Sequence, residues 1–154
     1  MTHEHSQAEM FAGASGSGVK DMPSEHSKIM TRKCVECHYW TARMNGDNTP
    51  SQKGGHTFRI DDRLCLKCHG NISAKLAEWD KKIIPLAAEL KGMLDKYPNK
   101  YSKAYISAKK NYGMATGDPG MNAKAVHNPA YAQTLLKIGI STLTSDSTWK
   151  QEKK

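Results

Sequence analysis

The chain has 154 residues and a formal net charge of +8 at pH 7, and only 38% of it is hydrophobic and 7% aromatic. No run approaches the roughly 18 apolar residues of a membrane span, so we expect no transmembrane segment, and the length predicts one domain. Basic chains often bind nucleic acid, but these lysines are spread along the sequence, and we expect no nucleic-acid partner.

The first 21 residues are predicted to form an arm. The run Gly13–Gly18 consists mainly of Gly and Ser and cannot hold regular structure by itself. We expect residues 1–21, which carry His3 and His5, to be flexible or bound to a partner. Ser24 then suits the N-cap of a short helix that is expected to run into the first cysteine motif.

One motif, C-x-x-C-H, occurs twice and uses every cysteine of the chain. In this pattern the two thiols form thioether bonds to a haem, and the histidine binds its iron. Two complete copies predict two covalently bound c-type haems. The expected attachment and ligand residues are Cys34, Cys37 and His38, then Cys65, Cys68 and His69.

Two other uses of the cysteines remain open. A four-cysteine zinc site has the right ligand type, but zinc would need only the four sulfurs, and both adjacent histidines would have no role. Two disulfides within C-x-x-C pairs would close almost no loop and add little stability. The absorbance bands of c-type haem, which survive denaturation, would distinguish these alternatives.

Three further helices are predicted after the second motif. Apolar residues over Ile72–Tyr97 alternate at spacings of four and three, which is typical of a long helix with a continuous apolar seam. A second helix with this spacing covers Tyr101–Ala115. Asn128 and Pro129 suit the N-cap and first residue of a final helix. No segment alternates with period two, so little or no β structure is expected.

These patterns predict an all-α fold with helices packed around two haems. Residues 22–154 would form the dihaem domain, with the haem motifs in 34–69 and the helical part in 72–144. Because apolar residues are few, we expect the haems to supply much of the core, and the chain without haem to unfold. The long seam is expected to pack partly on another chain; the alternative is that it packs wholly within this one.

The far side of each iron needs a ligand, and five histidines remain for it. A second histidine gives a low-spin electron carrier, a methionine raises the potential, and an open position permits substrate chemistry. His56 lies nine residues before Cys65, and His127 begins the last helix; both are favoured. Methionines are alternatives, but nothing in the sequence distinguishes any of them.

The order of these features resembles the C-terminal haem pair of the pentahaem, ammonia-forming cytochrome c nitrite reductases and of the related octahaem hydroxylamine oxidoreductases. Over residues 34–140 the shared order is C-x-x-C-H, a histidine, a second C-x-x-C-H, long helices, and a histidine that begins a final helix. The resemblance implies that His127 binds iron opposite His38, and that His56 binds iron opposite His69.

This chain also departs from that family. The nitrite reductases act at a separate haem, usually bound through C-x-x-C-K, and this chain has no such motif. The resemblance therefore implies electron transfer and not nitrite reduction. His26 is expected on the helix that carries the first motif, where it would point away from the distal face of that haem. We expect it to support a ligand or to contact a neighbouring haem.

The sequence thus predicts a dihaem c-type cytochrome that is not itself an enzyme. It would carry electrons to or from a larger multihaem oxidoreductase, as an oligomer or complex subunit, in nitrogen or anaerobic respiratory metabolism. The alternatives are a small peroxidase or nitrogen-oxide reductase with one open haem, and a haem-dependent sensor or assembly module. Because c-type haem is attached outside the cytoplasm, we expect an exported, periplasmic or equivalent location, with an export signal outside this numbering.

Overall fold

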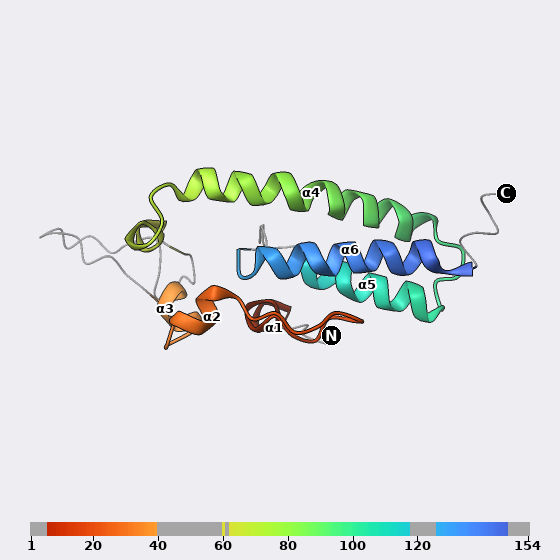
Figure 1. Cartoon of the computed structure of the whole chain (residues 1–154), viewed down its shortest axis with the longest axis horizontal. Coiled ribbons are helices and arrows are strands. Elements are labelled where there is room, and N and C mark those ends of the chain that lie inside the picture. The colour runs from red at the N-terminus through yellow and green to blue at the C-terminus, as the bar shows by residue number, and fades with distance from the viewer. Residues whose placement is uncertain (1–5, 40–59, 61, 118–125, 148–154) are drawn as a thin grey trace, which may run out of the picture.

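The computed structural model describes residues 6–39, 60, 62–117 and 126–147 (Figure 1). Within these ranges it contains helices and no strand, which confirms the predicted all-α class. The elements are α1 (Ser6–Ala12), α2 (Glu25–Ile29), α3 (Cys34–His38), the 3-10 helix η2 (Asp62–Lys67), α4 (Ile72–Lys96), α5 (Lys103–Thr116) and α6 (Pro129–Ser145). In the part of the chain that is described, no helix is both long enough and apolar enough to cross a membrane.

The three long helices α4, α5 and α6 lie side by side, and α5 runs antiparallel to the other two (Figure 1). Each begins at a residue whose side-chain oxygen accepts a hydrogen bond from a backbone N–H of the first turn; these caps are Asn71, Ser102 and Asn128. Such caps satisfy a donor that has no partner inside the helix. The predicted N-cap at Asn128 and first residue at Pro129 are confirmed, and the predicted bounds of α4 and α5 agree within two residues.

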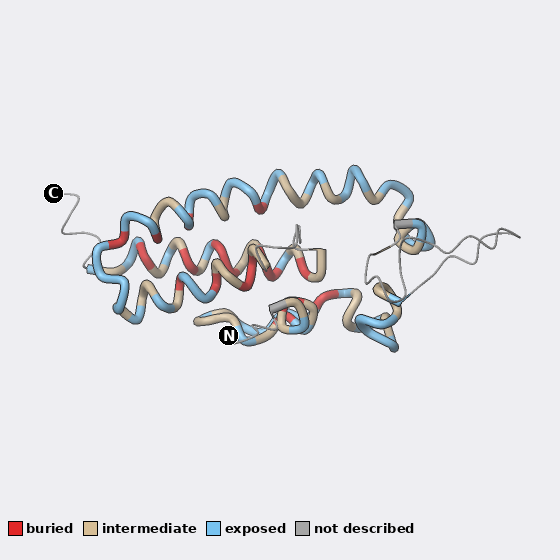
Figure 2. Tube along the Cα trace, turned by 180° about the vertical axis from the view of Figure 1, so that it is seen from behind, coloured by how far each residue is buried: buried red, intermediate tan, exposed pale blue. Residues whose placement is uncertain are grey.

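The buried core lies between α5, α6 and the second half of α4 (Figure 2). Gly139 of α6 lets α4 approach closely: a Cβ built there would lie 2.6 Å from Leu90 Cδ2. Ala108 of α5 is also fully buried. Small residues at these contacts bring the helices together, so a few large side chains fill the interior. Between these three helices the core is made of protein side chains.

The apolar seam of α4 is covered unevenly along its length. Ile83, Leu90 and Tyr97 are buried, whereas Ile72 and Leu76 are only partly covered. The second half of the seam packs within this chain, on α6 and α5. The first half extends beyond the bundle core toward the two cysteine motifs, as the pale first turns of α4 in Figure 2 show.

The described part of the expected N-terminal arm, from residue 6 onward, packs on the bundle instead of standing free. The Gly16 N–H donates to Tyr131 Oη at 2.9 Å. The Ser17 N–H donates to Asn111 Oδ1 at 2.7 Å, and Asn111 Nδ2 donates to the Ser17 carbonyl at 2.9 Å. Polar side chains of α5 and α6 thus satisfy a Gly- and Ser-rich backbone that makes no regular structure of its own. His3 and His5 lie outside the described residues.

Two short helices, α2 and α3, lead from Ser24 through the first motif, in place of the single helix that was predicted. Ser24 caps α2 as expected, accepting from the Ser27 N–H at 3.0 Å. That helix ends at Ile29, and a turn with Lys33 at φ 50° separates it from α3. A positive φ is incompatible with a continuing helix. The direction of His26 is therefore independent of the helix that carries Cys34.

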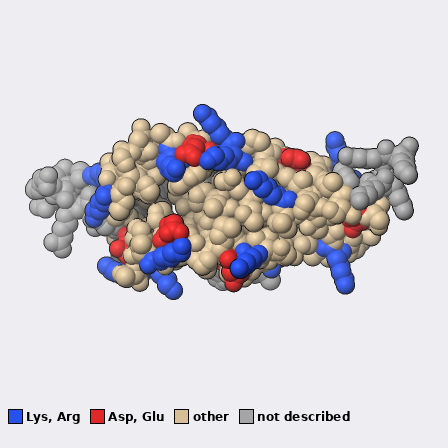
Figure 3. All heavy atoms as spheres, in the orientation of Figure 1, with Lys and Arg blue, Asp and Glu red and all other residues tan. Residues whose placement is uncertain are grey.

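The surface carries dispersed charge. On the face seen in Figure 3, Lys and Arg side chains lie apart from one another with acidic groups between them. Glu78 of α4, for example, pairs with Lys75 at 3.0 Å and with Lys82 at 2.6 Å. These pairs are exposed and contribute little to stability.

Candidate functional site

Both cysteine motifs adopt a turn of helix that presents their reactive groups together. In α3, Cys34 and Cys37 are three residues apart and His38 follows directly. In the second motif, the N–H groups of Cys68 and His69 both donate to the Cys65 carbonyl, at 3.1 and 2.8 Å. Side chains three and four residues apart share one face of such a turn. The two motifs lie at the same end of the molecule, beyond the start of α4 (Figure 1).

No disulfide joins the four cysteines, all of which lie among the described residues. Burial raises the pKa of the Cys37 thiol, and the neighbouring Cys65 raises it further. In the described ranges, which include all four cysteines, no three Cys, His, Asp or Glu side chains gather as a metal-binding group.

His127 lies opposite the first motif. Its ring centroid is 6.2 Å from that of His38, and the two ring planes make an angle of 30°. His127 comes directly before the N-cap of α6, so the capped start of that helix fixes its backbone. The structure thus brings together the two residues that were paired from the sequence, although 89 positions separate them.

A second pair forms between His26 and His69. Their ring centroids lie 5.9 Å apart, and the planes make an angle of 78°. The family resemblance paired His69 with His56, and His26 was left in a supporting role because α2 and α3 were taken as one helix. The turn between them lets His26 face the second motif instead. His56 lies outside the described residues.

The surroundings of His26 and His127 lower the pKa of both imidazoles. Burial lowers the pKa of His127, and the neighbouring His38 and His26 lower it further. Burial also lowers the pKa of His26, with His69 adding to the effect. Neutral imidazole is the form that binds metal ions, because protonation removes the ligating lone pair. The surroundings of both residues therefore favour the ligand form.

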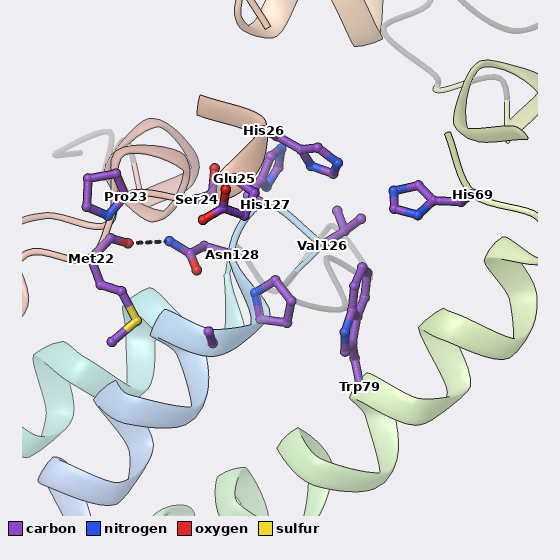
Figure 4. Close-up of a pocket in the computed structure, with 12 residues that line it drawn as sticks. Met22, Pro23, Ser24, Glu25, His26, His69, Trp79, Val126, His127 and Asn128 are labelled. Atoms are coloured by element: carbon purple, nitrogen blue, oxygen red, sulfur yellow. Dashed lines mark hydrogen bonds between the residues drawn. The ribbon is translucent and has the colours of Figure 1, made fainter. Parts of the chain in front are cut away.

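A cavity of about 370 Å³ lies between α2, the start of α6 and the first half of α4. Figure 4 shows His26, His69 and His127 around it, with the indole of Trp79 forming one wall. The His127 Nδ1 atom is buried and has no hydrogen-bond partner among the described atoms. A buried nitrogen without a protein partner is costly unless a bound group uses it.

The residues present fit bis-histidine haem. Two imidazoles that share one metal ion at the usual metal–nitrogen distance of about 2 Å have ring centroids about 6 Å apart. The centroid distances of 6.2 and 5.9 Å meet this requirement for both pairs. Each pair also includes the histidine of a C-x-x-C-H motif, whose cysteines are the attachment points for haem c. The site could therefore hold two haems with two protein ligands each.

Sequence reasoning missed two features of this site. The pairing of His26 with His69 was missed, although Ser24 marked the start of the helix that carries His26. Trp79 was read only as a member of the α4 seam. Its place on the wall of the cavity, beside the histidines, is a tertiary feature without a local sequence signal.

Comparisons with protein-family models, with curated proteins and with solved structures found no match for this chain.

Proposed function

We propose that this protein is a dihaem c-type cytochrome whose haems each have two histidine ligands, and that it transfers electrons to or from a larger multihaem oxidoreductase. The observation that carries the proposal is the convergence of two imidazole pairs on two C-x-x-C-H motifs at one end of the molecule. When bound, the haems supply one-electron redox chemistry. The chain supplies attachment, ligands and a partly buried setting.

The first haem would be attached through Cys34 and Cys37, with His38 and His127 as its ligands. The second would be attached through Cys65 and Cys68. Its ligands would be His69 and His26, a choice that replaces His56 of the sequence-based expectation because the His26 ring lies beside His69. Two protein ligands on each iron leave no position for substrate, which favours a carrier over a peroxidase or a nitrogen-oxide reductase.

The setting of the protein follows from this chemistry. Attachment of c-type haem outside the cytoplasm supports an exported, periplasmic or equivalent location. The motif order shared with multihaem nitrogen-cycle enzymes supports a role in nitrogen or anaerobic respiratory metabolism, as a subunit or partner of such an enzyme. The proposal does not assign acid–base chemistry to any residue.

Covalent haem is the first expected result. The chain should be expressed in a host that matures c-type cytochromes, denatured, and analysed by mass spectrometry and absorbance. We expect a mass increase of two haems and c-type absorbance bands that persist in denaturant. The double variant Cys65→Ala/Cys68→Ala should retain one haem. Zinc in stoichiometric amount, or a chain without added mass under these conditions, would contradict the proposal.

A further inference from the structure

We propose that Asn128 is a positioning residue that holds both distal histidines, His26 and His127, opposite their motifs. This inference rests on the proposed function, because it concerns how the chain places haem ligands. His26 and His127 come from segments about a hundred residues apart in sequence, and each must face a different motif. One buried amide side chain connects the two segments.

Both ends of the Asn128 amide are in use. Its Oδ1 accepts from the Tyr131 N–H at 3.1 Å, which caps α6 immediately after His127. Its Nδ2 donates to the Met22 carbonyl at 2.7 Å, a contact drawn in Figure 4. The residue is only 3% exposed. The bond that caps α6 is buried and the bond to Met22 is partly buried, so loss of the amide would leave polar groups with poor access to replacement partners.

Few free torsions lie between the Met22 carbonyl and His26. The Met22 N–H donates to the Gly13 carbonyl at 2.7 Å, so both polar backbone groups of this residue are held. Pro23 has a restricted φ, and Ser24 begins α2 as its N-cap. His26 is the second residue of α2. A displacement of Met22 should therefore also displace His26, because no flexible linker lies between them.

A second buried asparagine provides a matched control. Asn111 is fully buried and holds the same N-terminal segment, but it does so at Ser17, nine residues before His26. If Asn128 only contributed stability, the two asparagines would act alike. If Asn128 positions ligands, its loss should free a ligand position on one iron, which carbon monoxide can then occupy. Loss of Asn111 should lower stability and leave both irons with two histidine ligands.

The substitution Asn128→Asp separates the two functions of the side chain. An aspartate keeps an oxygen that can cap α6, because Asp and Asn are equivalent N-caps. It removes the donor to Met22 and sets a carboxylate against a carbonyl. We expect His26 to loosen while His127 stays in place. The fraction of the ferrous protein that binds carbon monoxide should rise about tenfold, at the haem of Cys65 and Cys68.

Asn128→Ala removes the cap as well, and both haems should then bind carbon monoxide. The Met22 carbonyl can also be displaced from its other side. Gly13 has φ +62°, and a Cβ there would lie 1.8 Å from the Met22 oxygen. Gly13→Ala should therefore open the His26 haem without touching Asn128, which keeps the inference testable if a variant at Asn128 does not fold.

The experiment compares wild type, Asn128→Asp, Asn128→Ala, Gly13→Ala and Asn111→Ala as holoproteins, by carbon monoxide binding and by electron paramagnetic resonance. Added imidazole should restore the six-coordinate spectrum of Asn128→Asp, which a merely destabilised protein would not show. Suppose that the wild type has two bis-histidine haems. The inference is then wrong if the Asn128→Asp protein binds no more carbon monoxide than the wild type, or if Asn111→Ala raises carbon monoxide binding to the same extent. A wild type without haem would instead refute the proposed function, and the inference with it.

Discussion

Replacing His26 by alanine should open the haem of Cys65 and Cys68 to carbon monoxide in the reduced protein. The His26 ring lies 5.9 Å from that of His69, the spacing that a shared iron requires. Without it, that iron would keep only His69 as a protein ligand, and one haem per chain should bind carbon monoxide essentially completely. The other haem should stay closed, because His38 and His127 are unchanged.

The matched control for this variant is His56→Ala. His56 was favoured from the sequence as the partner of His69, and both candidates lie eight or nine residues before a cysteine motif. We expect His56→Ala to leave the second haem six-coordinate. If His56→Ala opens that haem and His26→Ala does not, the pairing inferred from the motif order holds, and the ring contact between His26 and His69 has no role in ligation.

A chain that cannot attach haem should keep part of its fold. In the quadruple Cys→Ala variant we expect slow amide hydrogen exchange in α5, α6 and the second half of α4, whose buried side chains contact one another. The first half of α4 and the short helices α2 and α3 should exchange rapidly, because few protein contacts cover them. This replaces the expectation from composition that the whole chain unfolds.

Two leucines of α4 test this division within the chain that lacks haem. Leu90 is fully buried against α6, so Leu90→Ala should cost about 2–5 kcal/mol and remove the residual protected structure. Leu76 lies on the partly covered first half of the same seam, and Leu76→Ala should change the stability of the apo chain little. Equal effects of the two substitutions, or no protected amides at all, would contradict the described core.

The sequence predicted most of the helices because their signals are local. The four-three spacing of α4, its break before α5 and the Asn128-Pro129 start of α6 all depend on neighbouring residues. Composition could not predict how the bundle packs, because Ala108 and Gly139 let three helices approach closely with few large side chains. Hydrophobic content does not report how closely the helices approach.

The ligand pairs show a similar limit. His127 was found because a helix start marked it, and its predicted neighbour His38 lies beside it. His26 was expected to support a ligand or to contact a neighbouring haem, but its ring contact with His69 was not foreseen, because the sequence does not signal the turn at Lys33, which has a positive φ. Asn128 was recognised as a cap, but its bond to Met22 joins positions 106 residues apart and has no local pattern.

The central claim is that each of two haems has two histidine ligands, with the pairs His38–His127 and His26–His69. Low-temperature electron paramagnetic resonance of the oxidised holoprotein tests it most directly, because the angle between the two imidazole planes controls the anisotropy of a low-spin ferric signal. Nearly parallel planes give a rhombic signal, and nearly perpendicular planes give one with a large maximal g value.

The planes make angles of 30° in the first pair and 78° in the second. We therefore predict two low-spin signals of equal intensity, one rhombic and one strongly anisotropic, and no high-spin iron. The strongly anisotropic signal should disappear in His26→Ala, and the rhombic one in His127→Ala. A high-spin signal in the wild type, or a methionine-ligated haem by near-infrared magnetic circular dichroism, would contradict the account.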